Sequence, residues 1–445
     1  AAIFSCAAAM ATKEVAVTAP LIVGLYDRTF LSGSWRRTWR ERGAVHAGLA
    51  ATWLLLAVLV AGGPRSATAG FGFGKVTALQ YAMTQPGVIL HYLRLAFWPH
   101  PLCLDYVWTV ARGTAQVLWP GLALAGLLAA AAWALRRAPR LGFLGAWFFV
   151  ILAPTSSIVP IEDLAFEHRM YLPLAAVIVL AVWGADALSA RWAARGGEGG
   201  AGRRRLGRAA GAALLALVAL ALGAATMARN RDYRSALAMW ESVARIRPHS
   251  ARALCNLGME RALGGDAHGA LAAYRQAVRV DPLHAGARYN LGTALREQGE
   301  MREAEEHLRE ALRVRPDHME AAINLGSLLA DQSRLDEAVA LFRAARDGRP
   351  GGTAPRDHLA AQACTHLGNA LARRGDWSEA VAAYGDALRL RPGQYRAHYN
   401  LGLALQQLGR AREAAEHYQR ALALKPDHEG ARGALEALKG AAARP

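Results

Sequence analysis

Six prolines in the C-terminal half of the chain recur at an almost constant interval. They stand at positions 248, 282, 316, 350, 392 and 426, so that four of the five gaps are 34 residues long and one is 42. A fixed period of 34 residues is typical of tetratricopeptide (TPR) repeats, each of which is a pair of antiparallel helices. The spacing therefore predicts an all-α fold for this half, a TPR α-solenoid over residues 231–445.

The residues between the prolines repeat in phase. Gly258, Ala270 and Tyr274 of the first period are matched in the four later periods by Gly, by Ala and by a large apolar residue. Gly and Ala allow two helices to approach closely, the large residue fills the gap to the next pair, and Pro ends the second helix. The pattern predicts five full repeats, more than the roughly three that a stable stack needs. The stretch 351–357 lengthens the fourth period, and we expect it to form a loop.

Incomplete repeats flank the five full ones. Residues 235–247 match only the second helix of a repeat, and residues 429–439 match only the first. Such half-repeats are expected to act as caps, because the outer face of a terminal repeat has no further neighbour to cover it.

One polar position within the repeats indicates a binding surface. The place of Asn256 on the first helix is taken in the later repeats by Asn290, Asn324, His366 and Asn400. First helices line the concave face of a TPR superhelix, so we expect these side chains to form a ladder along its groove. A carboxamide offers both a donor and an acceptor, which suits an extended polypeptide backbone. The alternative is that these residues cap or bridge neighbouring helices.

The N-terminal half is apolar in long runs. A run of roughly 20 apolar residues can cross the hydrocarbon core of a membrane. The clear candidates are 44–62, 115–135, 171–190 and 209–228, with a fifth at 142–159 that Pro154 shortens. Lys13, Glu14 and Pro20 interrupt a sixth region at 1–25, which is one broken helix or two short ones. The runs predict a polytopic transmembrane helical domain over residues 1–230, with the lipid bilayer as its partner.

Arginines gather in three of the loops between these runs. The loops 28–42, 136–140 and 191–208 hold 14 of the 21 basic residues of the N-terminal 230. Short loops rich in Lys and Arg stay on the cytoplasmic side of a membrane. The alternation of spans then puts residues 63–114, 160–170 and the repeat half on the exoplasmic side, which is the periplasm if the protein is bacterial.

The net charge of +17 therefore does not indicate a nucleic-acid partner. The N-terminal 230 residues hold 21 basic and 9 acidic residues and the other 215 hold 31 and 26, so most of the excess lies beside the apolar runs. The charge of the repeats is mixed and forms no basic stripe of the kind that binds nucleic acid. The four cysteines show no CxxC pair and no cluster with histidine, so we expect neither a disulfide framework nor a metal site.

The expected exoplasmic segment 76–119 differs from an ordinary loop. Leu79, Met83 and Leu90 stand among further apolar residues at helical spacing, and a run rich in Trp, Pro and Tyr follows at 98–108. This pattern is typical of a helix that lies in the membrane interface. The segment is either a surface anchor without chemistry or a part of a site.

Four short motifs of the N-terminal half resemble those of a known family. They are Lys13-Glu14 with Pro20, Leu21 and Asp27; Pro99 to Leu102 with Asp105 and Tyr106; Pro154 to Pro160; and Glu167 to Pro173, which reads Glu-His-Arg-Met-Tyr-Leu-Pro. Together with the repeats they resemble the TMTC family, the transmembrane and TPR-containing O-mannosyltransferases, and its bacterial relatives. The resemblance implies a membrane domain of the glycosyltransferase C (GT-C) type, present here in part.

The resemblance also implies a reaction, the transfer of a sugar from a polyprenyl-phosphate carrier to Ser or Thr of a protein on the exoplasmic side. The sugar is typically mannose, the acceptor polypeptide is held by the repeats, and no further cofactor is implied. Such a transfer needs a carboxylate base and cations that stabilise the departing phosphate. In the GT-C fold the main carboxylate usually lies in the first exoplasmic loop. We expect that loop to precede Ala1, because the chain opens in an apolar run without Met.

Five residues are candidates for the remaining catalytic roles. Arg169 stands just before a span, where it is suited to hold a lipid phosphate that Glu167 helps to orient; the alternative is a salt bridge that fixes the loop. Lys13 and Glu14 are ionisable groups in an apolar region, where a charge is costly, so we expect them to have a function. The alternative is that they form an ion pair with each other. Asp105 is the fifth candidate, although Asp before Tyr also makes ordinary turns, and His100 lies near it in the sequence.

Two functions fit these patterns. One is a membrane glycosyltransferase that presents an acceptor polypeptide in its TPR groove. The other is a non-enzymatic, membrane-anchored TPR scaffold that binds proteins of the cell envelope. Because an anchor needs a single span, five or six spans with ionisable residues on one side favour the enzyme.

Overall fold

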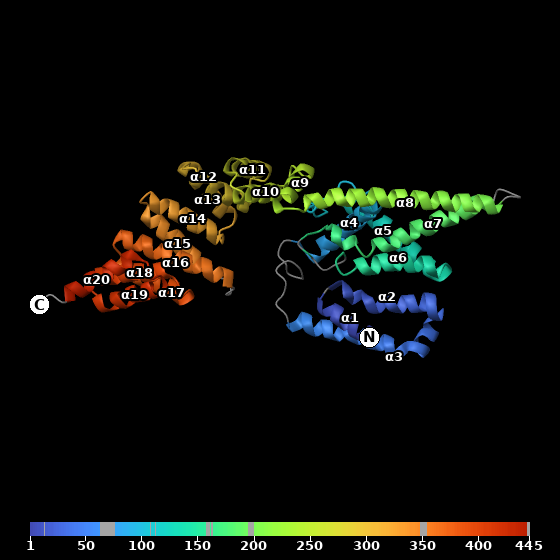
Figure 1. Ribbon diagram of the computed structural model, residues 1–445, viewed down its shortest axis with the longest axis horizontal. Coiled ribbons are helices and arrows are strands. Elements are labelled where there is room, and N and C mark those ends of the chain that lie inside the picture. The colour runs from blue at the N-terminus through green and yellow to red at the C-terminus, as the bar shows by residue number, and fades with distance from the viewer. Residues whose placement is uncertain are drawn as a thin grey trace. The chain divides into compact units, whose positions relative to one another are not determined.

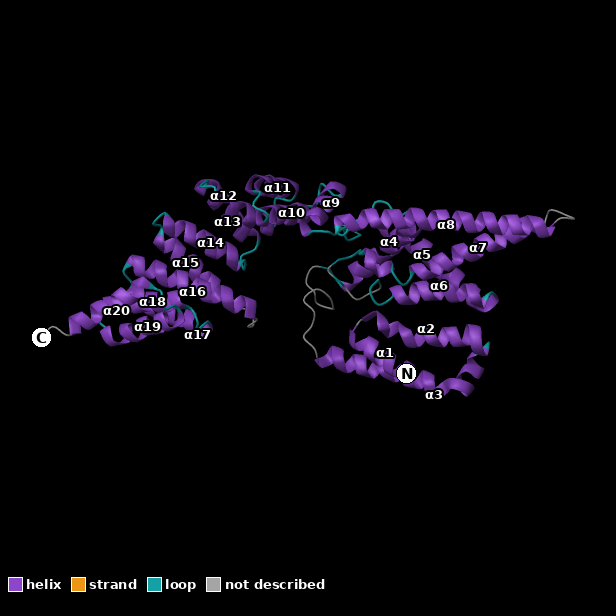
Figure 2. Ribbon diagram, in the orientation of Figure 1, coloured by secondary structure: helices purple, strands orange, loops and turns teal. Residues whose placement is uncertain are grey.

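The computed structural model describes residues 1–12, 14–62, 76–106, 108–111, 113–156, 161, 163–194, 200–347 and 354–442. The regular structure of these residues is helical, as the sequence predicts (Figure 2). The chain divides into two compact units, an N-terminal unit, Ala1–Arg247, and a C-terminal unit, Pro248–Pro445 (Figure 1). The boundary expected after residue 230 lies inside helix α8, and the two units separate after the next helix, α9.

The N-terminal unit is built from nine α-helices and three short helical turns among the described residues. These elements are α1 (Ala2–Thr12), η1 (Glu14–Thr18), α2 (Ala19–Tyr26), η2 (Asp27–Ser32), α3 (Trp35–Gly62), α4 (Ala78–Phe97), α5 (Thr114–Arg137), α6 (Pro139–Leu152), η3 (Glu167–Met170), α7 (Leu174–Ala194), α8 (Gly200–Asp232) and α9 (Ala236–Ile246). Each apolar run predicted as a span contains an α-helix, although the helix of the run at 142–159 ends at Leu152. The broken region at the N-terminus forms two short α-helices with a 3-10 turn between them, one of the two forms expected.

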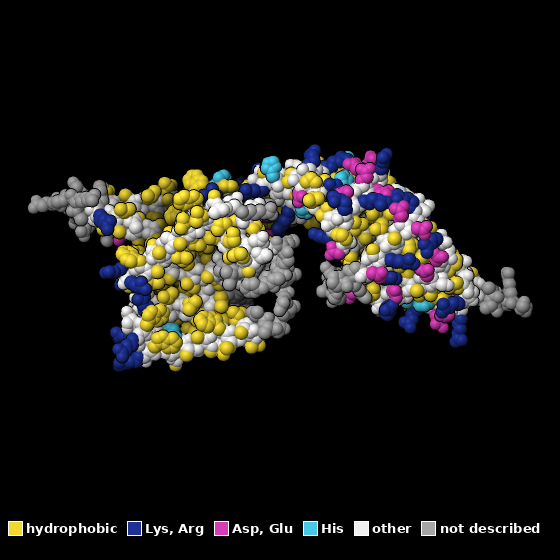
Figure 3. Space-filling view, turned by 180° about the vertical axis from the view of Figure 1, so that it is seen from behind, with side chains coloured by type: hydrophobic (Ala, Val, Ile, Leu, Met, Phe, Trp, Pro, Cys, Tyr) yellow, Lys and Arg dark blue, Asp and Glu magenta, His cyan; other side chains and the backbone are white. Residues whose placement is uncertain are grey.

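Only part of these helices are long and apolar enough to cross a membrane. Among the described residues three meet that measure, Trp35–Leu59, Thr114–Arg137 and Arg205–Asp232. The run predicted at 142–159 ends as a helix at Leu152, two residues before Pro154, and the apolar part of α7 covers only Leu174–Leu188. The five or six predicted spans thus reduce to three by length and composition. Apolar side chains cover the visible face of this unit (Figure 3).

The arginine-rich loops meet at one end of the N-terminal unit. The turn from α2 to α3, the turn from α5 to α6 and the facing ends of α7 and α8 all lie at that end (Figure 1), and Lys and Arg side chains gather there (Figure 3). The guanidinium of Arg28 joins two of these turns, because it donates to the carbonyl of Leu135 at 3.4 Å. Gly142 permits the tight turn between α5 and α6, since a Cβ there would lie 2.2 Å from the backbone nitrogen of Leu135. The common side predicted for these loops agrees with this arrangement.

Helix α4 packs into the unit by a face that the sequence analysis did not single out. Tyr81 and Tyr92 are fully buried along it, and so is Val88 of the predicted apolar stripe, whereas Leu79 and Phe97 of that stripe are both 70% exposed. The helix therefore has apolar residues on two faces, one in the core of the unit and one at its surface. Segment 76–119 therefore includes a helix that carries core residues of the unit as well as exposed apolar residues.

The C-terminal unit is a row of helix pairs, as predicted. The pairs are α10 (Ala251–Leu263) with α11 (Ala267–Val280), α12 (Ala285–Glu297) with α13 (Met301–Val314), α14 (Met319–Asp331) with α15 (Leu335–Asp347), α16 (Ala354–Arg374) with α17 (Trp377–Leu390) and α18 (Tyr395–Gln407) with α19 (Ala411–Leu424), followed by the single helix α20 (Glu429–Ala442). Five pairs match the five predicted repeats. The half-repeat predicted at 429–439 forms α20, and the one at 235–247 forms α9.

The glycine and the aromatic residue that recur in phase contact each other between the two helices of a pair. A Cβ on Gly368 would lie 2.5 Å from Tyr384, and a Cβ on Gly402 would lie 2.5 Å from Tyr418. Both tyrosines are buried, with 2% and 0% of their surface exposed. The glycine thus makes room for the flat face of the ring, which is the close approach that the sequence predicted.

The turn inside each pair uses a left-handed backbone. Gly265, Gly299, Gly375 and Gly409 have φ between 75° and 94°, a conformation that favours glycine. Ser333 takes the same place in the third pair with φ 63°.

The prediction of a loop over 351–357 was wrong in part, because α16 already begins at Ala354 and is 21 residues long against 13 for α14. The extra residues lengthen a first helix, and residues 348–353 lie outside the described part of the chain.

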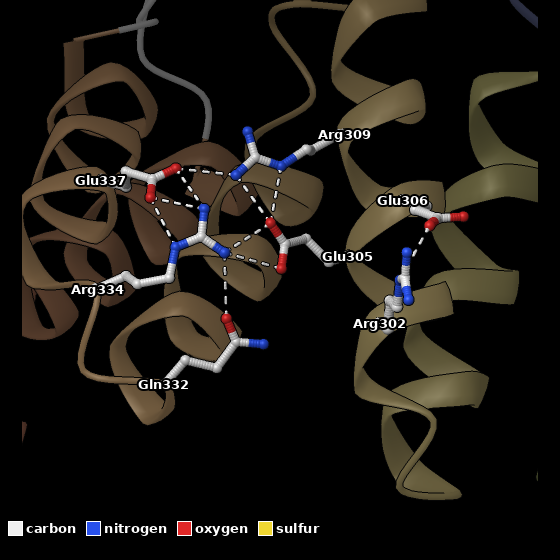
Figure 4. Close-up of polar contacts among 7 residues, drawn as sticks. All are labelled: Arg302, Glu305, Glu306, Arg309, Gln332, Arg334 and Glu337. Atoms are coloured by element: carbon white, nitrogen blue, oxygen red, sulfur yellow. Dashed lines mark hydrogen bonds and ion pairs between the residues drawn. The ribbon is translucent and has the colours of Figure 1, made fainter.

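Ion pairs connect the second helices of neighbouring pairs on the outer side. Glu305 of α13 accepts from Arg309 at 2.8 Å and from Arg334, at the start of α15, at 2.8 Å. Glu337 of α15 accepts in turn from Arg309 at 2.9 Å and from Arg334 at 2.6 Å. The four side chains form a closed ring of alternating charge between the two helices, as Figure 4 shows. The nearby pair of Arg302 and Glu306 lies within α13 and stays outside this ring (Figure 4).

Candidate functional site

The five predicted ladder residues lie on the first helices of their repeats. Asn256 is on α10, and Asn290, Asn324, His366 and Asn400 follow on α12, α14, α16 and α18. All five side chains are half-buried. The position that repeats in the sequence therefore repeats in the structure, once on each first helix.

The amide nitrogens of the ladder reach back to the preceding repeat. Nδ2 of Asn290 donates to the sulfur of Cys255 at 3.2 Å, and Nδ2 of Asn324 donates to the hydroxyl of Thr293 at 3.0 Å. These bonds cross from one first helix to the one before it, which is the bridging role that the sequence analysis left open. Bridging does not remove the side chain from the inner surface, because Asn324 also lines the groove described below. The hydrogen bond instead holds the amide in one orientation.

The fourth position carries an aromatic ring in place of an amide. His366 stacks on Phe342 of α15, with the ring centroids 5.5 Å apart and the planes at 20°. Burial lowers the pKa of His366 below the usual value for histidine, so the ring is neutral near pH 7. The amide of this repeat is Asn369, whose Oδ1 accepts from Asn400 at 2.9 Å and from the hydroxyl of Tyr384 at 2.8 Å.

Asn369 is a groove residue that the sequence analysis missed. The in-phase pattern drew attention to position 366 alone, where the fourth repeat departs from asparagine. Residues three apart on a helix share a face, so an asparagine three positions after a missing rung was a signal in the sequence that the ladder continues there.

The ladder residues of the later repeats line a groove in the C-terminal unit. Its volume is about 820 Å³, within the range of about 300–1,000 Å³ that ligand pockets span. First helices α12, α14, α16 and α18 supply most of the wall, and Phe342, Trp377 and Tyr384 add aromatic surface. The polar residues that line it are Arg296, Asn324, Ser327, Asp331, Gln362, His366, Asn369, Arg373, Asn400 and Gln407.

The charges of the groove are few and partly paired. Arg296 contacts Asp331 across two repeats at 3.4 Å, which neutralises both groups. Arg373 is an exposed guanidinium on the same wall. Amides therefore outnumber charges on this surface, and an amide recognises other amides without demanding a charge on the ligand.

In the N-terminal unit, Arg169 is held by backbone carbonyls. Its guanidinium donates to the carbonyls of Asp163 at 2.6 Å, Leu164 at 3.2 Å and Thr155 at 3.2 Å, and to the hydroxyl of Tyr81 at 3.4 Å. The hydroxyl of Tyr81 also donates to Thr155, at 2.6 Å. These bonds tie the segment before α7 to α4 and to the end of α6. The geometry resembles the loop-fixing alternative, except that carbonyls take the place of the carboxylate.

The other catalytic candidates are placed less fully. Lys13 lies outside the described residues, and the side chains of Glu14 and Glu167 lie outside the described part of the structure as well. The backbone of Glu14 begins η1, and that of Glu167 begins η3 with Arg169. Glu167 and Arg169 therefore share one helical turn.

Asp105 lies in the segment between α4 and α5, and Arg169 lies in η3. The side chain of Asp105 is buried, with 9% of its surface exposed, and the backbone carbonyl of the same residue accepts from the thiol of Cys103 at 3.1 Å. The adjacent ring of Tyr106 packs on His91 of α4, with centroids 4.9 Å apart. Burial, together with Arg94 and Arg247, lowers the pKa of His91 to about 4. His100 is exposed in the same segment.

No group of three or more His, Cys, Asp or Glu side chains is suited to hold a metal ion among the described residues. The side chains of Cys6, Cys103, Cys255 and Cys364 are all buried.

A model of the tetratricopeptide repeat family matches the chain at residues 260–304, 291–353 and 366–429. The C-terminal unit is a TPR unit. These matches all lie within it, so the resemblance of the N-terminal unit to a glycosyltransferase rests on its sequence motifs alone. No curated protein matches the chain.

Solved structures of other TPR proteins are similar to the TPR unit. YrrB, described as a TPR protein with an unusual peptide-binding site, is 22% identical with a TM-score of 0.38, and the match covers 44% of this chain and 97% of YrrB. MamA of Desulfovibrio magneticus RS-1 is 22% identical with a TM-score of 0.35, over 40% of this chain and 97% of MamA. PilF of Pseudomonas aeruginosa is 20% identical with a TM-score of 0.36, over 44% of this chain and 93% of PilF.

Proposed function

We propose that the protein is a membrane-anchored scaffold that binds extended polypeptide in the groove of its TPR unit. The observation that carries this proposal is the groove between α12 and α18, whose wall repeats an amide on successive first helices. The amide groups that the bridging bonds leave unused match the C=O or the N–H of a peptide bond, so binding would depend on backbone conformation more than on side-chain sequence.

Trp377 is the aromatic residue of the groove that can supply an apolar contact for such binding, because Phe342 and Tyr384 are only 1% and 2% exposed. Phe342 and Tyr384 are buried beneath the wall, and Trp377 is half-buried beside them. A polypeptide in the groove would cover this surface while its backbone contacts the amides. The combination suits ligands of varied sequence, which is what a scaffold for several partners requires.

We further propose that the N-terminal unit lies in a membrane with the TPR unit on the exoplasmic side. Three helices are long and apolar enough to span a bilayer, and the arginine-rich turns share one end of the unit (Figure 1). The excess of arginine at one end favours a cytoplasmic position for that end.

An isosteric substitution in the groove tests the binding function. Asn369→Asp keeps the oxygen that accepts from Asn400 and Tyr384 but removes the NH₂ donor that a peptide carbonyl would use. We expect the affinity of the full-length protein for an extended peptide, selected from a library of mixed sequence, to fall about twofold to tenfold. Binding is measured by fluorescence anisotropy of the labelled peptide.

The matched control makes the same chemical change away from the groove. Gln419 is an exposed residue of the second helix α19, so Gln419→Glu should leave peptide affinity unchanged. Equal effects of Asn369→Asp and Gln419→Glu would show that the added charge, and not the lost donor, is responsible, and would contradict binding in the groove.

The motif Glu167 to Pro173 favours a second candidate function, the glycosyltransferase that the family resemblance implies. Glu167 and Arg169 share the turn η3 beside α7, and the reaction would move a sugar, expected to be mannose, from a polyprenyl-phosphate carrier to a Ser or Thr. The test is incubation of full-length protein in membranes with a labelled polyprenyl-phosphate sugar, with Arg169→Ala as the variant. Absence of transfer to any protein would leave the scaffold as the function, and full transfer by Arg169→Ala would remove the phosphate role of that residue.

A further inference from the structure

An apolar cavity lies in the N-terminal unit at the end where the arginines gather. Its volume is about 390 Å³, and residues of α2, α3 and α6 line it. Trp35, Trp39 and Trp53 of α3 line it together with Leu21 of α2 and Val150 of α6. The three tryptophans are each between 37% and 55% exposed, so the cavity opens to the surface of the unit between them.

A neutralised cluster closes the inner side of this cavity. His46 lines it, and Nε2 of His46 contacts the carboxylate of Asp27 at 2.9 Å, while Arg42 donates to the second oxygen of Asp27 at 2.6 Å. Asp27 is buried, with 3% of its surface exposed. Because its charge is balanced by Arg42, the cluster does not repel an anion at the mouth of the cavity.

Two arginines beside the tryptophans of the cavity form no ion pair with a described carboxylate. Arg36 and Arg40 follow Trp35 and Trp39 directly and lie four residues apart, so they form a ridge next to these tryptophans. Both are exposed, and neither forms an ion pair with a described carboxylate, whereas Arg37 is paired with Glu41 at 2.6 Å. A concave apolar surface therefore adjoins two cations that are available to a ligand.

We propose that this cavity binds one anionic phospholipid, with an acyl chain between the tryptophans and the phosphate at Arg36 and Arg40. An apolar chain suits a cavity whose wall is aromatic and aliphatic, and the paired cations complement a negative head group. Tryptophan is the residue preferred at the depth of the head groups, and basic pockets between membrane helices on the cytoplasmic side are suited to anionic lipid. The inference rests on the membrane placement proposed above.

The experiment uses the full-length protein in vesicles of phosphatidylcholine that contain a trace of lipid with a photoactivatable acyl chain. One preparation carries the probe on phosphatidylglycerol and the other carries it on phosphatidylcholine, and mass spectrometry locates the adducts. We expect the anionic probe to label α2 and α3 in preference to the neutral probe. Arg36→Gln and Arg40→Gln should each lower that labelling about fivefold, which is the effect of one cation near a membrane surface of about 1 kcal/mol.

A control and a second variant separate the parts of the site. Arg136 is an exposed arginine at the same end but belongs to helix α5, which contributes no residue to the cavity, so Arg136→Gln should not change the labelling. Ala50 lines the cavity, and Ala50→Phe should reduce labelling at α2 and α3 by filling the space for the chain. Far-ultraviolet circular dichroism checks its helical content, and the exposed Arg36→Gln variant tests the site independently if Ala50→Phe does not fold.

Each outcome decides the proposal. Equal labelling by the two probes, or equal effects of Arg36→Gln and Arg136→Gln, would overturn a specific anionic lipid site. Complete competition by soluble glycerol phosphate would also overturn it, because the acyl chain would then contribute nothing. Protein that washes off the vesicles at alkaline pH would contradict the membrane placement itself, which is a different failure from insertion without lipid preference.

Discussion

At the scale of single residues, the repeats depend on a glycine whose missing side chain is replaced by a ring from the partner helix. The tightest examples are Gly258, Gly368 and Gly402, where a Cβ would lie 2.5 Å from a tyrosine carbon. Interiors are packed at the density of crystals, so an extra methyl group has no space unless the ring moves. The constant spacing between the glycine and the tyrosine in the sequence therefore reflects a contact between the two helices of a pair.

We expect Gly402→Ala to lower the free energy of unfolding of the TPR unit by about 1–3 kcal/mol, because the methyl group overlaps Tyr418. The matched control is Gly385→Ala in helix α17, where no atom lies within 4 Å of the new methyl group. That change should stabilise by about 0.5–1 kcal/mol, since alanine restricts the unfolded chain more than glycine does. Denaturant unfolding with hydrogen exchange of α17 to α19 measures both, and equal signs for the two variants would contradict the packing argument.

Two histidines in the last repeat form a contact that depends on pH. Nδ1 of His398 lies 3.0 Å from Nδ1 of His417, and Nε2 of His398 contacts the carbonyl of Pro392 at 3.1 Å. If Nε2 of His398 donates to this carbonyl, neutral His398 accepts at Nδ1 from His417. Burial lowers the pKa of both rings below the usual value of 6.5, and the proximity of His398 adds to the effect on His417.

We therefore expect the TPR unit to lose stability as the pH falls. The unfolded chain binds protons at these rings more tightly than the folded chain, so the stabilisation is complete above about pH 6.5 and decreases as the pH falls through that value toward the lowered pKa values. His417→Gln should reduce the decrease between about pH 7.5 and about pH 5.5, measured by denaturant unfolding. His268→Gln, at an exposed position of α11, serves as the control, and an equal reduction in both variants would contradict the assignment.

At the scale of helices, the outer faces of neighbouring repeats are joined by charge. The ring of Glu305, Arg309, Arg334 and Glu337 links α13 to α15 (Figure 4). The side chain of Glu305 is 18% exposed, and two arginines contact it. Exposed ion pairs contribute little, while a shielded group in a network contributes more.

We expect Glu305→Gln to lower the free energy of unfolding by about 1 kcal/mol, because it removes the charge that both arginines share. Glu306→Gln is the matched control, since Glu306 meets Arg302 at 3.8 Å with the two side chains 67% and 96% exposed. Its effect should stay below about 0.5 kcal/mol. Hydrogen exchange of α13 and α15 in low and high salt checks the result, and a loss for Glu305→Gln that salt does not reduce would argue against a charge effect.

The sequence predicted which segments form helices better than it predicted which face of a helix is buried or where a helix begins. The 34-residue period predicted each pair of the TPR unit, because its signal recurs five times. The buried face of α4 was not predicted, since Tyr81 and Tyr92 belong to a second stripe that only the packing against the 155–169 segment reveals. The start of α16 was also missed, because the glycines before Ala354 suggested a loop over residues that extend the helix.

At the scale of the whole molecule, the proposed topology can be tested through the cysteines. All four native thiols lie in the interior, so a single new cysteine reports its own surroundings. We expect Gln419→Cys on the TPR unit to react with a membrane-impermeant maleimide in intact cells. Arg40→Cys, in a loop expected on the cytoplasmic side, should react only after the cells are permeabilised. The reverse pattern would contradict the orientation that the arginines favour.

The sequence by itself determined the elements that repeat or that are set by composition: the helix pairs of the TPR unit, the row of Asn256, Asn290, Asn324 and Asn400, and the apolar helices of the N-terminal unit. These features can be read from spacing along the chain, because the repeated contacts of the helix pairs fix the period and the thickness of a membrane fixes the length of an apolar helix. The tertiary structure alone decided which groups meet across large separations. Asn369 beside Asn400, Arg169 beside Tyr81, and Asp27 between Arg42 and His46 arise from packing of segments that are separated along the chain, and no local pattern encodes these contacts.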